Sequence, residues 1–236
     1  MIVLGYDLES SGLDTSNDRI HEFGAVLFDM KKKVPLQLFS CFVRPSLPYP
    51  ENYVSPTGLE LSWLNQFGMP ITEAFGELQK MCALAECVVA QNGINYDKPL
   101  TKAELERNFM KDHLLMQLHW VDTRYDLPFD YAPKSRHLNH LAADAGFINP
   151  FPHRALFDAM TCVRLASMYD FEKVLAHSKI PWVNVRIMTN FDQKQIAKDL
   201  RYSWDGKMWT KKVKEDQFEA EKMAAEARGV SVVKLA

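Results

Sequence analysis

The 236-residue sequence has little net charge, few cysteines and no long apolar run, and each shortage excludes a class of protein. Lys plus Arg total 28 and Asp plus Glu total 30, so the formal net charge is −2 and no global positive field indicates a polyanionic partner. No uninterrupted apolar stretch reaches the roughly 18 residues of a membrane span. The first residues also lack the basic region and cleavage site of a signal peptide. We therefore expect a soluble, cytoplasmic protein with no membrane partner.

The four cysteines lie mostly in apolar segments and form no CxxC pair. Neither a disulfide framework nor a zinc site is therefore indicated, and reduced thiols in a protein core are expected. With 47% hydrophobic residues, the chain can bury one core of moderate size and still carry a small appended module. The cysteines are Cys41, Cys82, Cys87 and Cys162.

Apolar residues alternate in three short segments at the start of the chain, a pattern typical of β-strands. We expect strands at Met1–Asp7, Ile20–Asp29 and Leu36–Val43, paired antiparallel because their connections are short. Prolines then interrupt regular structure over Arg44–Pro56, which predicts a long surface loop.

The hydrophobic period changes after this loop, and helices alternate with short strands. A strand meander followed by βαβα is typical of an α/β fold with a mixed sheet, here of about five strands, flanked by helices on both faces. The expected helices are Thr72–Ala85, Lys98–Lys111, Ser135–Ala145 and Ala155–Tyr169, and the expected strands are Cys87–Ala90 and Gln117–Asp122.

Two carboxylates lie one residue apart at the end of the first expected strand. Residues at i and i+2 project from one face of a strand, so Asp7 and Glu9 lie side by side. Like charges this close repel unless a cation lies between them. A bound Mg²⁺ or Mn²⁺ is one interpretation, and simple exposure to solvent where the strand ends is the other.

Two further acidic residues follow apolar segments. Asp97 begins the helix after the strand Cys87–Ala90, where it could act only as a helix cap. Asp158 lies within an apolar helix, where an unpaired carboxylate is costly. His153 would point well away from Asp158 if both were helical, so we place His153 on the loop before the helix.

Three segments around these residues resemble, in order and spacing, the three motifs of the DEDDh 3′–5′ exonucleases. This family includes the proofreading subunit of bacterial replicative DNA polymerase, exonuclease X, ribonuclease T and oligoribonuclease. Ser10 and Ser11 replace the threonines common after the glutamate, and Gln91 replaces a common histidine, but neither change removes an expected metal ligand. The matching segments are Asp7–Leu13, Asn92–Asp97 and His153–Asp158.

The resemblance implies an RNase H-like exonuclease fold over residues 1–180 and a site for two divalent cations, Mg²⁺ or Mn²⁺. It implies that Asp7 bridges both ions and that Glu9 and Asp158 hold the ion that carries the nucleophilic water. Asp97 would support the other ion, and His153 would be the general base.

The same resemblance suggests residues that contact the substrate. A hydroxyl or amide of Ser10–Gly12 could meet the 3′-OH, and Leu13 could wedge against the terminal base or pack within a turn. Asn92 could orient the strand or cap a turn, and Tyr96 could stack on a base or pack internally. The candidate substrate-binding residues are Ser10, Ser11, Gly12, Leu13, Asn92 and Tyr96.

Residues 181–236 are expected to form a small module with a helical tail at Gln217–Arg228. From Trp182 onward there are 11 Lys plus Arg and 8 Asp plus Glu, so this end is slightly basic. Ile196–Trp209 is similar to a short W-D…K-x-W module of unsettled function that is appended to varied enzymes. Its aromatic residues could stack on single-stranded nucleic acid or form the core of the module. They are Tyr202, Trp204 and Trp209.

The expected function is a metal-dependent 3′–5′ exonuclease that releases nucleoside 5′-monophosphates. The expected partner is nucleic acid with a free 3′ end, with single-stranded DNA favoured over RNA, and replication or repair proteins could accompany it. The alternatives are an exoribonuclease of the same family and a catalytically idle nucleic-acid-binding or assembly module. An RNase H-like nuclease that cuts internally is disfavoured by the histidine of the third motif.

Overall fold

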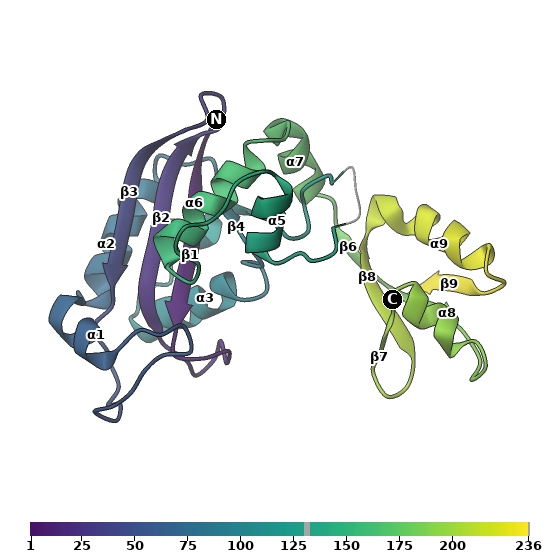
Figure 1. The fold of residues 1–236 in the computed structure, drawn as a ribbon, viewed down its shortest axis with the longest axis horizontal. Helices are drawn as coiled ribbons and strands as arrows, with labels where there is room; N and C mark the ends of the chain where they lie inside the picture. The colour runs from purple at the N-terminus through teal and green to yellow at the C-terminus, as the bar shows by residue number, and fades with distance from the viewer. Residues whose placement is uncertain (130–132, 236) are drawn as a thin grey trace. The chain divides into compact units, whose positions relative to one another are not determined.

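A computed structural model gives the fold and describes residues 1–129 and 133–235 (Figure 1). Contacts divide the chain into two units, Met1–Ser178 and Lys179–Ala236. Within the described ranges, no helix has the length and apolarity needed to cross a membrane.

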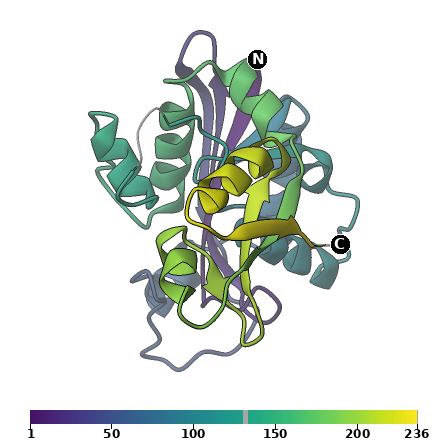
Figure 2. The same ribbon diagram turned by 90° about the vertical axis from the view of Figure 1, so that its right-hand side faces the viewer.

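The centre of the first unit is a five-stranded sheet built from β1 (Ile2–Ser10), β2 (Ile20–Asp29), β3 (Val34–Phe42), β4 (Cys87–Ala90) and β5 (His119–Asp122). The strand order is β3-β2-β1-β4-β5. Neighbours among β1, β2 and β3 are antiparallel, whereas β4 and β5 extend the sheet in parallel beside β1. The long strands lie side by side in both views of the ribbon (Figure 2).

Seven helices of the described residues accompany this sheet: α1 (Leu61–Phe67), α2 (Ile71–Cys82), α3 (Asp97–Arg107), α4 (Leu114–Gln117), α5 (Leu138–Asp144), α6 (Ala155–Ala166) and α7 (Phe171–Ser178). Figure 1 shows α6 in front of β1 and β2, with α2 and α3 behind the sheet. The predicted α/β architecture, a mixed sheet flanked by helices, is confirmed.

The sheet separates two apolar cores, and this separation determines where the charges of β1 point. Tyr6 lies in the core shared with α2, and Val3 lies in the core shared with α6. Because side chains alternate along a strand, Asp7 and Glu9 share the face of Val3. The carboxylates of β1 therefore lie on the side of the sheet that α6 covers.

The beginning of α6 packs directly against β2 because Gly24 has no side chain. A Cβ built on Gly24 would stand 2.0 Å from the carbonyl carbon of Ala155, a distance that no real side chain permits. Asp158 follows in the first turn of α6. The close approach at Gly24 therefore positions Asp158 beside the end of β1.

Some element boundaries differ from the sequence prediction. β1 continues through Ser10 rather than ending at Asp7, because its ladder with β2 pairs Glu9 with Glu22. Ser135–His137 is not helical, and α5 begins only at Leu138. The helices α1, α4 and α7 were not predicted, since all three are short.

The second unit contains a four-stranded sheet of β6 (Trp182–Met188), β7 (Ser203–Trp204), β8 (Trp209–Lys214) and β9 (Ser231–Lys234). Its order is β7-β8-β6-β9, and every pair is antiparallel. The remaining elements are α8 (Lys194–Asp199), η1 (Glu215–Gln217) and α9 (Phe218–Glu226). The expected helical tail is wrong in one respect, because the chain after α9 returns to the sheet and pairs with β6 as β9.

The aromatic residues of this unit divide between the two alternatives left open by the sequence. Tyr202 is buried in the core of the unit, whereas Trp204 is 54% exposed. The rings of Trp204 and Trp209 lie 5.5 Å apart. Lys211 points inward and donates a hydrogen bond of 2.7 Å to Glu221. Part of the expected basic and aromatic cluster is therefore structural.

Candidate active site

One cleft of about 430 Å³ lies where the end of β1, the loop after β4 and the beginning of α6 meet. The backbone brings these three segments together although they are far apart in the sequence. All five residues of the expected metal and catalytic set line this acidic cleft. They are Asp7, Glu9, Asp97, His153 and Asp158.

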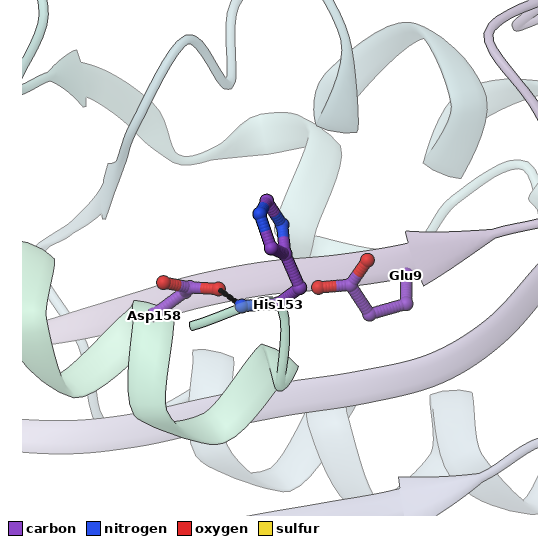
Figure 3. A group of neighbouring side chains, drawn as sticks. All are labelled: Glu9, His153 and Asp158. Atoms are coloured by element: carbon purple, nitrogen blue, oxygen red, sulfur yellow. Dashed lines mark hydrogen bonds between the residues drawn. The ribbon is translucent and has the colours of Figure 1, made fainter. Parts of the chain in front are cut away.

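Glu9, His153 and Asp158 form the tightest group in the cleft (Figure 3). Each offers a possible ligand atom, and these atoms lie within 4.8 Å of one another. His153 lies on the loop before α6, is exposed and has a φ of 63°. Figure 3 shows its imidazole standing between the two carboxylates.

The carboxylate of Asp158 is fixed from both sides. The main-chain N–H of His153 donates to Oδ2 at 2.9 Å, and Nδ2 of Asn149 donates to Oδ1 at 2.6 Å. Charge-assisted hydrogen bonds of this kind hold a carboxylate in one orientation. Asp158 is therefore oriented before any ligand arrives.

Burial raises the pKa of every carboxyl group in the cleft, and repulsion by neighbouring carboxylates raises the pKa values of Asp7, Glu9 and Asp97 further. Burial is the largest cause in each case: it raises the pKa of Glu9 to about 7 and that of Asp97 to about 8. The pKa of Asp7 lies well above its usual value through burial and the charges of Asp97, Asp158 and Glu9. Burial also raises the pKa of Asp158, against the opposing effect of its hydrogen bonds. Carboxyl groups this crowded are stabilised either by protonation or by a bound cation.

The donor set fits hard divalent cations. Oδ1 of Asp97 is buried and finds no hydrogen-bond partner among the residues that the structure describes. Carboxylate oxygens are the ligands that Mg²⁺ and Mn²⁺ prefer. A cation would satisfy this orphaned oxygen and offset the crowded charges of Asp7 and Glu9.

Of the expected substrate-binding residues, Asn92 and Tyr96 line the acidic cleft. The hydroxyl of Tyr96 donates to the carbonyl oxygen of Gly12 at 2.5 Å and is hydrogen bonded to Oγ of Ser10. Tyr96 thus connects the loop after β4 to the loop after β1. Both Tyr96 and Ser10 have a structural task whether or not they contact a substrate.

Ser11, Gly12 and Leu13 lie in the adjacent loop and are not among the residues that line the cleft. Oγ of Ser11 donates to Oδ1 of Asp18 at 2.7 Å, so this hydroxyl is engaged within the loop. A Cβ on Gly12 would stand 2.6 Å from the carboxylate of Asp18. Leu13 is 87% exposed and therefore does not pack within the turn.

Asp122 has a positioning task that the sequence pattern did not assign. Its carboxylate accepts hydrogen bonds from the main-chain N–H of Asn92 at 2.8 Å and of Arg124 at 3.0 Å. Asp122 is fully buried, and burial raises its pKa to about 6. The signal was its place at the end of a buried strand, the place that the sequence prediction gave to Asp7.

Arg154 and Glu22 were also missed. Nε and Nη2 of Arg154 donate to the Glu22 carboxylate at 3.0–3.2 Å in a bidentate pair. Glu22 stands opposite Glu9 in the ladder of β1 and β2. The guanidinium therefore compensates a buried carboxylate next to the cluster. In the sequence, the position of Arg154 in the third motif, next to His153, indicated a possible role.

Hydrogen-bond donors line another part of the acidic cleft. They come from the segment after β5 and the beginning of α5, where Ser135–Leu138 is similar to a lesser family motif, but the sequence assigned these residues no role. Gln91, which stands where a histidine is common in relatives, connects to this segment by donating to the carbonyl oxygen of Arg136 at 2.7 Å. The donors are Arg124, His137, Asn139 and His140.

Comparisons with known proteins agree with this architecture. The exonuclease family model RNase_T matches residues 4–166, more than half of the chain. A structure of exonuclease I is similar with a TM-score of 0.61 at 16% identity, covering 78% of this chain and 48% of that chain. The chain thus spans about half the length of that relative.

Two further structures share the fold. E. coli exonuclease I in complex with a dA16 oligonucleotide has a TM-score of 0.65 at 14% identity, with 98% of this chain and 68% of that chain covered. The nuclease domain of 3′hExo, a DEDDh family member bound to rAMP, has a TM-score of 0.57 at 15% identity, with 71% and 90% covered. A comparison with curated proteins found no significant match. The RNase H-like exonuclease fold is thereby confirmed, and the match over residues 4–166 shows that the chain belongs to the exonuclease family.

Proposed function

We propose that the first unit is a DEDDh-type, metal-dependent 3′–5′ exonuclease that releases nucleoside 5′-monophosphates from single-stranded nucleic acid. The gathering of four carboxylates and one exposed histidine in a single cleft carries this proposal. The similar E. coli exonuclease I was solved with DNA oligonucleotides, which supports DNA as the favoured substrate. Replication or repair proteins are the partners that such an enzyme would serve.

The cleft residues divide the work of holding the cations. Asp7 would hold both ions, Glu9 and Asp158 one of them, and Asp97 the other. Two bound divalent cations would offset the charge of the scissile phosphate and stabilise the attacking and leaving oxygens.

His153 takes the proton from the attacking water. Its exposed imidazole lies beside Glu9 and Asp158, and an imidazole held in place is a common general base. The water oxygen forms a bond to the terminal phosphorus, and the bond from that phosphorus to the 3′-oxygen of the preceding nucleotide breaks. The terminal residue then leaves as a 5′-monophosphate, and the freed 3′-oxygen of the shortened strand takes up a proton from water to become a 3′-OH.

The donors on the other part of the cleft bind the phosphates of the strand. Arg124, His137 and His140 are suited to this because cationic and N–H donors pair with phosphate oxygens. Asn92 and Tyr96 border the same space and would orient the terminal nucleotide.

A 3′–5′ exoribonuclease is the second candidate, since the similar 3′hExo nuclease domain was solved with rAMP. Discrimination would rest on a contact to the 2′-OH.

The test is parallel digestion of 5′-labelled single-stranded DNA, mismatched duplex and RNA, with Mg²⁺ or EDTA, and with Asp7→Ala as the blank. Stepwise shortening of DNA in Mg²⁺ alone is the expected result. Faster shortening of RNA would favour the second candidate. Internal fragments, or binding without any cleavage, would contradict both.

A further inference from the structure

The sheet of the second unit has helices on one face only among the described residues. Both α8 and α9 contribute to the single apolar core of this unit, with Ala197 and Ala225 packed on Val185 and Ile187 of β6. Because side chains alternate along β6, its residues Asn184, Arg186 and Met188 must point to the opposite face. That face has no core of its own.

The ladder defines which residues share this uncovered side, which we call the open face. Asn184 pairs with Lys212, and Arg186 pairs with Thr210 on one side and with Val233 on the other. By this register the open face comprises Trp182, Asn184, Arg186, Met188, Ser203, Thr210, Lys212, Lys214, Ser231 and Val233, of which Lys214 is buried.

Charge on the open face has one sign. Its ionisable residues, Arg186, Lys212 and the buried Lys214, are all cations, and Arg186 and Lys212 lie diagonally across β6 and β8. Within residues 179–235, as described, Arg186 has no ion pair and no side-chain hydrogen bond, and Lys212 contacts only the ring of Trp182 at 6.0 Å. The local field is therefore positive although the whole chain carries a formal charge of −2.

Part of the acidic charge of this unit is neutralised elsewhere. Three of them form ion pairs with cations that are not on the open face, so they do not compensate Arg186 or Lys212. These pairs are Asp199 with Arg228, Glu221 with Lys211 and Glu215 with Lys234.

Apolar and polar neutral groups lie between the cations. Met188 and Val233 are each 43% exposed, and Asn184 and Thr210 offer an amide and a hydroxyl. A flat surface with cations for phosphates, donors for base edges and apolar patches for base faces suits an unpaired strand. A duplex would keep its bases stacked inside and could use only the cations.

We propose that the open face binds single-stranded nucleic acid through its phosphates at Arg186 and Lys212 and through its bases at Met188 and Val233. This is a second binding site, separate in sequence from the acidic cleft. It would let the nuclease bind the strand at a point away from the terminus that is cut. The site does not depend on the sugar preference of the cleft.

The test measures binding by the full-length chain with Asp7→Asn, so that no strand is consumed. A fluorescent single strand of about 20 nucleotides exceeds the site size of about 4–16 nucleotides typical of small sheet modules. Its dissociation constant is measured by anisotropy from low to moderate salt. Arg186→Gln with Lys212→Gln should weaken binding about tenfold and reduce the slope of log K against log salt by about 1.4, or about 0.7 for each lost phosphate contact.

The matched control is Lys194→Gln with Lys198→Gln, which removes the same charge from the exposed side of α8 in the same unit. This control should change affinity less than twofold. Equal losses in both double variants, or an unchanged slope in the open-face variant, would overturn the proposal.

Thermal unfolding and duplex binding complete the test. Thermal unfolding shows whether the open-face variant is folded; if it is not, the exposed single change Lys212→Gln should still reduce the slope by about 0.7. An equal loss of duplex affinity would refute the preference for an unpaired strand. Failure of the parent chain to cleave DNA would refute the proposed nuclease activity, but it would leave this binding result unaffected.

Discussion

The main-chain N–H of His153 donates a 2.9 Å hydrogen bond to Oδ2 of Asp158, and the imidazole of the same residue stands beside that carboxylate. The backbone of His153 therefore orients a proposed metal ligand, while its side chain is left available to accept a proton. Changes to the side chain should separate these two tasks.

Replacing the imidazole should remove proton transfer and keep Asp158 in place. His153→Ala should slow the chemical step by about 10²- to 10⁴-fold, the usual contribution of a positioned base. Because φ at His153 is 63°, His153→Gly is the matched variant: it should lose the same rate while being more stable than the alanine variant by about 1–2 kcal/mol. The pH–rate profile should change, and an unchanged profile would remove His153 from the role of base.

Asp7→Ala should abolish turnover and leave the fold intact. Asp7 lies among four other carboxylates that raise its pKa, so its loss relieves repulsion in the metal-free protein. The melting temperature in EDTA should therefore stay equal or rise. Asp112→Ala, at an exposed aspartate, is the control and should keep the parental rate. Degradation by the Asp7 variant at the parental rate would contradict the proposed ligand role.

Without divalent cations, stability should fall as the pH rises from about 4.5 to about 8. The pKa of Glu9 rises from 4.5 to about 7 on folding, and that of Asp97 rises from 3.8 to about 8. A carboxyl group with a raised pKa stabilises the folded state fully below its unfolded pKa, and this contribution is lost as the pH passes the folded value. Mg²⁺ should therefore raise the melting temperature more at pH 8 than at pH 5. A Mg²⁺-induced rise in melting temperature that is independent of pH would contradict a cation site here. So would the absence of any such rise in both the parent protein and Glu9→Gln.

Gly24→Ala should displace the beginning of α6. The new Cβ would lie 2.0 Å from backbone atoms of Ala155, so the helix must move away from β2 and carry Asp158 with it. We expect a loss of about 1–3 kcal/mol or more in the free energy of unfolding, together with lower activity. Gly76→Ala in α2 is the control: its Cβ meets nothing within 4 Å, and it should stabilise by about 1 kcal/mol. Similar stability in both variants would show that α6 does not depend on this contact.

Removing the guanidinium of Arg154 should weaken cation binding at neutral pH. The charge of Arg154 lowers the pKa of both Glu22 and Glu9, so its loss raises these values further and leaves Glu22 buried without its partner. Arg154→Ala should destabilise the fold by about 1.5–3 kcal/mol and shift the Mg²⁺ requirement to higher concentration. Arg154→Lys retains the charge without the bidentate geometry. Its stability and its Mg²⁺ requirement should therefore lie between those of the parent protein and of Arg154→Ala. Equal Mg²⁺ titrations for all three proteins would contradict this effect.

Local patterns predicted much of the fold because they depend on neighbours along the chain. β2 and β4 have the predicted boundaries, since alternation over Ile20–Asp29 and the short apolar run Cys87–Ala90 specify strands without outside help. The beginning of α5 was wrong because Gln91, from a distant strand end, contacts the carbonyl oxygen of Arg136 and keeps that segment extended. Contacts of this kind leave no periodic signal.

The candidate substrate-binding residues likewise show which features local sequence predicts and which depend on contacts elsewhere in the chain. Ser11 was expected near the 3′-OH from its motif, but its hydroxyl contacts Asp18, which lies seven residues later. Trp204 and Trp209 looked equivalent in sequence, yet only the register of β7 and β8 reveals that they pair with each other near the end of the sheet. The roles of these residues toward substrate stay predictions.

The sequence by itself determined the identity and order of the acidic residues, the strands that carry them and the resemblance of their spacing to a nuclease family. These properties follow from local alternation and from the residue types that a divalent cation requires. Only the tertiary structure decided that Asp7, Asp97 and Asp158 share one cleft, that Arg154 compensates Glu22, and that Arg186 and Lys212 share one face of the second sheet. Proximity between distant segments depends on strand register and helix packing, which no short stretch of sequence encodes alone.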